Sequence, residues 1–211
     1  MGLMAKAKGE STFTPVSEGL HPAICSGVVD LGMQPGSDMY PKPKRQVYLR
    51  FDCVDEQIEY EKDGKQLSGP ARCGATYTLS LGEKSKLRPL LESWRGKKFT
   101  DAELEGFDVS RLLGAPGQVQ ILHTHKNGNT YANVQTIVPF PKGVDKPRVP
   151  DDAVYFSAAD PDCPQSTFDK LPKWLQEKIK GRLADDEDGL RPSAPPESAN
   201  DSPDFDDDIP F

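Results

Sequence analysis

The apolar residues of this chain change their period twice. Up to residue 81 they tend to alternate, most clearly in residues 45–55, as expected of strands with one buried face. Residues 83–94 instead carry their leucines and Trp94 at helical spacing, and Gly96 follows as a stop signal. Alternation then returns near residue 118. The chain is therefore expected to be mainly β, with a helix between two groups of strands.

Five strands are predicted, three before the helix and two after it. Their expected bounds are Leu20–Leu31, Arg45–Asp55, Cys73–Leu81, Gln118–His125 and Thr130–Val138. Asn127-Gly128, between the last two strands, is a strong signal for a tight hairpin turn. This order is that of a five-stranded OB-fold barrel with a helix between strands 3 and 4, and it also fits a five-stranded α+β sheet.

The helical region is expected to contain three pieces. The helix predicted in Glu83–Trp94 includes Pro89, so it should begin late or kink at that residue. Thr100–Glu103 has the spacing of a capping box, which predicts a short helical turn. A second turn is expected in Asp108–Leu113.

Composition divides the chain into four parts. These are a flexible arm (1–18), the OB-fold domain (19–140), a proline-rich connector with an amphipathic helix (141–181) and a disordered acidic tail (182–211). Residues 151–163 of the connector are expected to be irregular. In the predicted helix Lys170–Gly181, apolar residues from Leu171 to Ile179 form one stripe, which either docks on the barrel or binds a partner.

The tail carries most of the negative charge. The formal net charge is −7, and residues 181–211 hold ten acidic and two basic residues. Residues 1–150 hold 20 basic and 17 acidic residues, so the body is slightly positive. The pI of about 5.1 therefore does not exclude nucleic-acid binding by the body.

Signals for catalytic or metal sites are weak. The cysteines and histidines are Cys25, Cys53, Cys73, Cys163, His21, His123 and His125. They show neither C-x-x-C nor zinc spacing, and the cysteines are expected to be buried, reduced thiols. Because P-loop, H-E-x-x-H and G-x-S-x-G motifs are also absent, we predict no enzyme activity, no catalytic residue, no metal and no cofactor. A metal-dependent nuclease without a compact motif is the remaining enzymatic alternative.

The last eight residues combine acidic and apolar side chains: Asp204, Phe205, Asp206, Asp207, Asp208, Ile209, Pro210 and Phe211. The repelling aspartates and Pro210 disfavour a folded element, whereas Ile209 and Phe211 suit an apolar pocket with a basic rim. This segment, DFDDDIPF, resembles the acidic tip of bacterial single-stranded-DNA-binding proteins. The resemblance implies docking of host replication, recombination and repair enzymes; the alternative is a solubilising tail.

A second resemblance covers residues 99–143, FTDAELEGFDVSRLLGAPGQVQILHTHKNGNTYANVQTIVPFPKG. This segment is similar to phage-encoded OB-fold single-strand binders, with weaker similarity in HPAICSGVVDLG. The resemblance implies the fold and binding of single-stranded DNA (ssDNA) without strong sequence preference in phage DNA replication, recombination or repair. It assigns no residue roles. Since neither a signal peptide nor a membrane span is recognisable, we expect a protein of the bacterial host cytoplasm, associated with the nucleoid, without a membrane partner and compatible with a homo-oligomer.

Binding of ssDNA requires flat rings for base stacking and cations for phosphates. Ten residues outside the predicted core meet this requirement: Tyr40, Lys42, Lys44, Arg45, Tyr48, Arg50, Arg95, Lys97, Lys98 and Tyr131. Each also has a structural reading, as a sheet-edge ring, an ion-pair partner or a solvated helix end.

Two further hypotheses concern the tail. The acidic tail is joined to the body by a flexible linker long enough to fold back across a small domain. It is therefore expected to compete with DNA for a basic groove on the body. Alternatively, the protein is an adaptor or decoy that sequesters host enzymes through the tip, with little DNA binding by the body.

Overall fold

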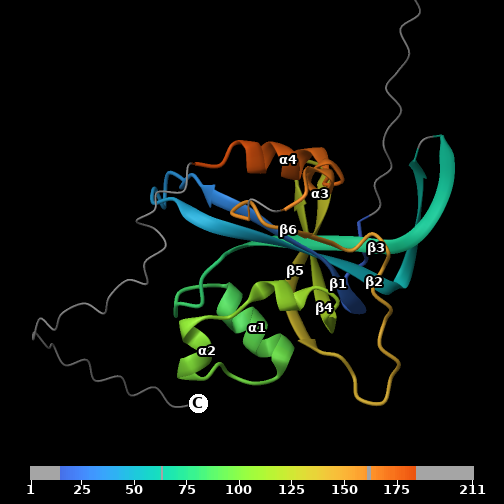
Figure 1. Ribbon diagram of the computed structural model, residues 1–211. Coiled ribbons are helices and arrows are strands. Elements are labelled where there is room, and N and C mark those ends of the chain that lie inside the picture. Colours follow the sequence, from blue (N-terminus) through green and yellow to red (C-terminus); the bar gives the residue numbers. More distant parts are fainter. Residues whose placement is uncertain (1–14, 63, 161–162, 184–211) are drawn as a thin grey trace, which may run out of the picture.

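The computed structural model describes residues 15–62, 64–160 and 163–183. This part of the chain is mainly β, with helices on both faces of a six-stranded, mostly antiparallel sheet (Figure 1). The strands are β1 (Gly19–Gln34), β2 (Lys44–Lys62), β3 (Lys65–Thr78), β4 (Pro116–Lys126), β5 (Asn129–Pro139) and β6 (Val154–Phe156). The helices are α1 (Leu87–Arg95), α2 (Asp101–Glu105), the 3-10 turn η1 (Val109–Leu112), α3 (Gln165–Asp169) and α4 (Lys173–Lys180).

Strand β1 is the centre of the sheet and pairs with three other strands. Strand β2 runs antiparallel along one edge of β1. On the other edge, β4 pairs with Gly19–Ile24 and the short parallel strand β6 pairs with Gly27–Val29. Strand β6 lies in the stretch predicted to be irregular. That prediction was wrong. Strand β6 forms because β4 leaves part of the edge of β1 unpaired, and the sequence of three residues does not reveal that this edge is available.

A β-bulge in β1 explains why its apolar pattern is imperfect. The register with β2 shifts around Ser26, between residues 25 and 27, and an extra residue at a bulge reverses the alternation beyond it. As a result, Cys25 and Val28 face one hydrophobic core, while Val29 faces a second core on the opposite side of the sheet. One continuous strand thus contributes to both cores.

The first core lies between the sheet and the helices α1, α2 and η1. As predicted, the alternating residues of β2 from Val47 to Cys53 face this core, and Phe51 packs edge-on against Trp94 with ring centroids 5.6 Å apart. Trp94 Nε1 donates a hydrogen bond to the Pro116 carbonyl at 2.9 Å. A Cβ added at Gly117 would lie 2.6 Å from Trp94 Nε1, so this close packing requires glycine.

The second core lies on the other face, beneath β6, α3 and α4 (Figure 1). The helix predicted in Lys170–Gly181 begins later than expected, because α4 starts at Lys173, directly after Pro172. Its residues Leu175 and Ile179 are buried against the sheet. The C-terminal helix therefore docks on the sheet, which was one of the two alternatives left open by its apolar stripe.

Strands β2 and β3 differ most from their predicted bounds. Strands β2 and β3 continue to a hairpin at Lys62–Lys65, so β3 begins at Lys65 instead of Cys73 and ends at Thr78 instead of Leu81. Helix α1 begins late, at Leu87, which places Pro89 in its first turn as expected. The capping box at Thr100 and the Asn127-Gly128 hairpin turn, with positive φ at both residues, are confirmed.

The hydrogen-bonded order of the strands is β3-β2-β1-β4-β5, with β6 as a branch on β1. Strands β3 and β5 stand at the two ends of this order and are not hydrogen-bonded to each other in the described chain, so the sheet is not a closed barrel. The prediction of a mainly β protein is confirmed, whereas the predicted five-stranded OB-fold barrel is not, because the sheet does not close. No helix within the described ranges has the length and apolar character needed to cross a bilayer.

Candidate nucleic-acid interface

One groove on the described surface opens between the unjoined ends of the sheet, β3 and β5. Its volume is about 1200 Å³. It is lined by the β2–β3 surface, the hairpin between β4 and β5, the start of α4 and the residues just before β1. Three of the predicted DNA contacts, Tyr48, Arg50 and Tyr131, lie in this groove. Arg72 and Trp174, which are not among the predicted contacts, line the same groove.

The aromatic residues of the groove differ in their exposure. Tyr131 on β5 is 50% exposed and Trp174 on α4 is 47% exposed, so both rings offer a face to a ligand. Tyr48 is only partly exposed, and Trp174 packs edge-on against it at 5.0 Å between ring centroids. Burial also raises the pKa of Tyr48 to about 12. Tyr48, predicted to point outward, therefore supports Trp174 more than it contacts solvent.

The position of Tyr48 depends on a glycine in the neighbouring strand. A Cβ at Gly74 of β3 would lie 2.2 Å from Tyr48 Oη and 2.7 Å from the Leu49 carbonyl oxygen. The ring thus crosses the space that a side chain would fill. Gly74 is consequently needed for the shape of this wall of the groove.

The cationic wall of the groove is formed by Arg50 and Arg72, and both are already paired. Arg72 Nη2 donates to Asp52 Oδ2 at 3.3 Å and to Asp152 Oδ2 at 2.7 Å. Although partial burial opposes it, the charges of Asp52 and Asp152 hold the pKa of Arg72 above its usual value. Arg50 donates from Nη2 to the backbone carbonyls of Ser26, at 3.0 Å, and Asp152, at 2.8 Å. These contacts fix the two guanidinium groups in place.

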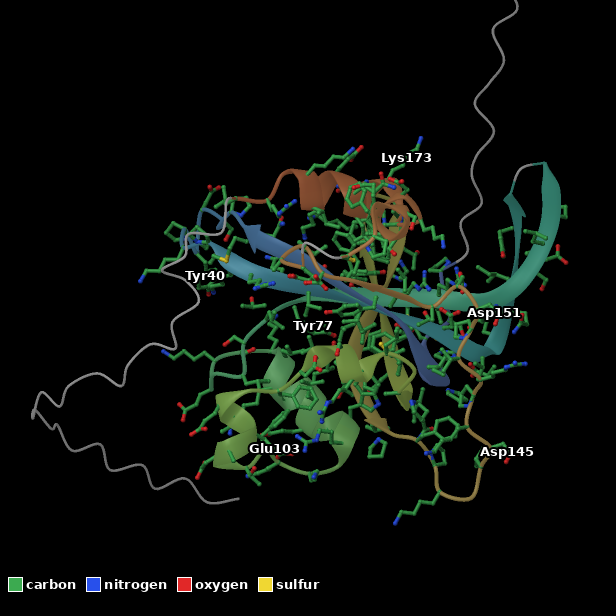
Figure 2. The ribbon with its side chains drawn as sticks, in the orientation of Figure 1. Tyr40, Tyr77, Glu103, Asp145, Asp151 and Lys173 are labelled. Atoms are coloured by element: carbon green, nitrogen blue, oxygen red, sulfur yellow. The ribbon has the colours of Figure 1, made fainter. Side chains whose placement is uncertain are left out.

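A second group of predicted contacts surrounds a separate groove of about 990 Å³. Tyr40, Lys44 and Arg45 line it together with Lys84 and Lys86. Lys44 Nζ lies 5.4 Å from the centroid of the Tyr40 ring, a cation–π distance. Figure 2 shows Tyr40 at the far end of the sheet from Asp151, which precedes β6.

Two members of this second group differ in their freedom to bind DNA. Arg45 Nη2 lies 2.6 Å from Asp30 Oδ2, and the Asp30 carboxylate is largely buried. Burial of Asp30 opposes its ionisation, but hydrogen bonds from Arg45, from the Gly32 amide and from Ser157 lower its pKa below the ordinary value. Arg45, on β2, is therefore a structural ion-pair partner, whereas Lys42, in the loop before β2, is exposed.

The third predicted group, at the end of α1, is not part of either groove. Arg95 lies over the Phe99 ring, with its guanidinium carbon 4.3 Å from the centroid, and forms an ion pair with Glu103. Lys97 Nζ is 3.9 Å from Glu103 Oε1, and Lys98 is exposed. Arg95 thus holds α1 to α2, a contact that the sequence did not predict.

The cysteines and histidines of the described chain form no group arranged to hold a metal ion. Cys25, Cys53 and Cys73 are buried free thiols, as expected, and Cys163 is only partly exposed. His21 Nδ1 lies 3.1 Å from Asp55 Oδ2, a contact between β1 and the long β2–β3 ribbon.

The predicted partner-docking tip, Asp204–Phe211, lies outside the described residues. The arm before residue 15 lies outside them as well. The structure therefore places seven of the ten predicted DNA-contact residues in or beside two grooves and three elsewhere, and it does not bear on the tip.

Two groove residues were missed by the sequence reading for identifiable reasons. Arg72 precedes the predicted start of the third strand by one residue, so its direct cross-strand pairing with Asp52 was not anticipated. Trp174 was assigned to the apolar stripe of the last helix.

No protein-family model matches the chain, and no curated protein shows significant similarity to it. The geometry of the grooves and the two resemblances noted in the sequence are therefore the basis for a functional proposal.

Proposed function

We propose that this protein binds ssDNA without strong sequence preference, as a phage-type protein of DNA replication or recombination. The groove between β2–β3 and β5 is the proposed binding site for bases and phosphates. In this proposal the DFDDDIPF tip recruits enzymes of the bacterial host cytoplasm.

The strand order supports an OB-fold origin for the sheet. OB folds are five-stranded, partly open Greek-key barrels that bind oligonucleotides on the face of strands 2 and 3 and through the loops between strands 1 and 2 and strands 4 and 5. Here the order β3-β2-β1-β4-β5 leaves the opening between β3 and β5, and α1 follows β3. The first groove is lined by the β2–β3 face and by the β4–β5 turn. We infer an open OB-fold barrel extended by β6, α3 and α4.

A single observation carries the proposal: two half-exposed aromatic rings and two arginines line the same groove. Tyr131 and Trp174 supply stacking surfaces from different elements, while Arg50 and Arg72 supply positive charge. Stacking and phosphate contact together are what sequence-tolerant single-strand binding requires.

The proposal is tested by titrating the full chain into labelled oligothymidylate, a mixed-sequence oligonucleotide and a duplex. We expect similar affinities for the two single strands, weaker binding to the duplex and a strong decrease with salt. Absence of ssDNA binding at low salt by both the full chain and a chain ending at residue 183 would refute it.

A second candidate function is the adaptor or decoy, in which the tip sequesters host enzymes and the body binds little DNA. It is favoured by the pairing of three candidate arginines, Arg45, Arg50 and Arg72, with carboxylates or carbonyls of the protein. The same titration separates the two functions, because the decoy retains partner binding without ssDNA affinity.

The role of the tip is tested separately with Phe211→Ala. Loss of the terminal ring removes pocket filling, so binding to host enzymes that recognise the bacterial tip should be lost while ssDNA affinity stays nearly unchanged. Equal affinity of the wild type and the variant for those enzymes would contradict the docking role.

A further inference from the structure

The turn that leads into β6 brings the Asp152 carboxylate next to Arg50 and Arg72, the two arginines of the first groove. The Ala153 amide donates to the Pro150 carbonyl at 3.0 Å, which closes a turn with Asp151 and Asp152 at its tip. Directly after it, Val154 pairs with Gly27 of β1. The turn is therefore anchored at the sheet, and Figure 2 shows Asp151 on it.

Two carboxylates share the guanidinium of Arg72, and they differ in their surroundings. Asp52 is buried, accepts a hydrogen bond from Ser26 Oγ at 2.5 Å and lies directly across the strand pair from Arg72. Asp152 has a side chain that is 55% exposed, and it approaches from a surface turn. Its Oδ1 is also 4.0 Å from Arg50 Nη2. Asp52 is thus a fixed partner, whereas Asp152 is replaceable.

The formal charges of this cluster cancel while Asp152 is in place. Arg50 and Arg72 contribute two positive charges, and Asp52 and Asp152 contribute two negative charges. If Asp152 leaves, the wall of the groove has a net positive charge. Guanidinium groups bind carboxylate and phosphate with the same fork of N–H donors, so a phosphodiester fits where the Asp152 carboxylate lies.

We propose that Arg50 and Arg72 form a phosphate subsite that Asp152 occupies in the free protein. A backbone phosphate of ssDNA displaces the Asp152 carboxylate from Arg72, and the exposed Asp152 side chain turns away from the guanidinium while its backbone stays anchored. This inference rests on the proposed function and adds to it a built-in competitor, contributed by the connector rather than by the tail. Asp152 is accordingly a residue that lowers DNA affinity.

The matched pair Asp152→Asn and Asp151→Asn tests this inference in the full chain. Both variants remove one negative charge from the same turn, but within the described chain Asp151 has no ion pair with an arginine. Binding to labelled oligothymidylate is measured over a range of salt concentrations, and thermal melts confirm the fold of each variant.

We expect D152N to bind more tightly than wild type at low salt, by up to about fivefold, the upper end of the range for exposed ion pairs. In D152N the charge of Arg72 is no longer balanced by Asp152, so it neutralises one more phosphate of the DNA. The slope of log K against log salt should therefore steepen by up to about 0.7. D151N should change both quantities less.

Equal effects of D152N and D151N, or tighter binding by D152N without a steeper slope, overturn the inference while leaving ssDNA binding by the wild type intact. Absence of binding by all three proteins overturns the proposed function as well.

Discussion

Replacing Tyr131 with alanine should weaken ssDNA binding and leave the sheet intact. Tyr131 lies on β5 beside the hairpin turn, and half of its surface is exposed in the first groove. Its backbone pairs with Thr124 of β4, a pairing that does not depend on the ring. The substitution therefore removes a stacking surface without removing a charge or a strand contact.

The expected loss follows from the exposure of the ring. Stacking of one base on an aromatic side chain contributes about 1–3 kcal/mol. Because the protein already covers half of Tyr131, we take the lower part of this range, about 1–2 kcal/mol, which corresponds to a roughly 5- to 30-fold higher Kd. The salt dependence should stay that of the wild type, since no phosphate contact is lost.

Fluorescence anisotropy with labelled oligothymidylate at low and moderate salt measures this loss. The matched control is Tyr60→Ala, because Tyr60 is 41% exposed on the same sheet but is not part of either groove. A Tyr131→Ala affinity close to that of the wild type, or equal losses in the two variants, would show that the groove does not stack bases.

Three further predictions use other contacts of the fold. Trp174 is exposed in the groove while Trp94 is 6% exposed in the core, so ssDNA should quench tryptophan fluorescence in the wild type but not in Trp174→Phe; equal quenching would place DNA elsewhere. Asp30→Asn should lower the free energy of unfolding by about 1.5–3 kcal/mol at neutral pH. Arg45 and other donors lower the pKa of Asp30 in the folded state. The difference in unfolding free energy is therefore present above the ordinary pKa of 3.8 and should shrink when urea unfolding is measured at lower pH. A difference that does not depend on pH would contradict this prediction. Gly117→Ala should cost about 1–3 kcal/mol by crowding Trp94, and an unchanged melting temperature would refute that packing argument.

Much of the fold followed from local patterns in the sequence. The alternation from Val47 to Cys53 predicted the buried face of β2, and Asn127-Gly128 predicted the hairpin that joins β4 and β5. The late start of α1 and the capping box at Thr100 followed from the same kind of reasoning. Each of these features depends on residues that are close together in the chain, so its cause can be read directly from the sequence.

The candidate site was predicted only in part. Tyr48, Arg50 and Tyr131 were recognised because outward positions of alternating strands are readable from sequence. Their surroundings were not: Tyr48 is covered by Trp174, and Arg50 contacts the turn that carries Asp152. Both covering elements come from the connector and the last helix, more than 100 residues further along the chain.

The sequence by itself determined the order of β1 to β5 with α1 between β3 and β4, the buried face of β2, and the difference in charge between the acidic end of the chain and its near-neutral body. Only the tertiary structure decided that β3 and β5 stay unjoined, that β6 completes the edge of β1 and that Arg72 stands between Asp52 and Asp152. The physical reason is the same in each case. Periodicity and turn chemistry are local properties, whereas an open sheet edge, a bulge at Ser26 or a shared guanidinium depends on which distant segments meet.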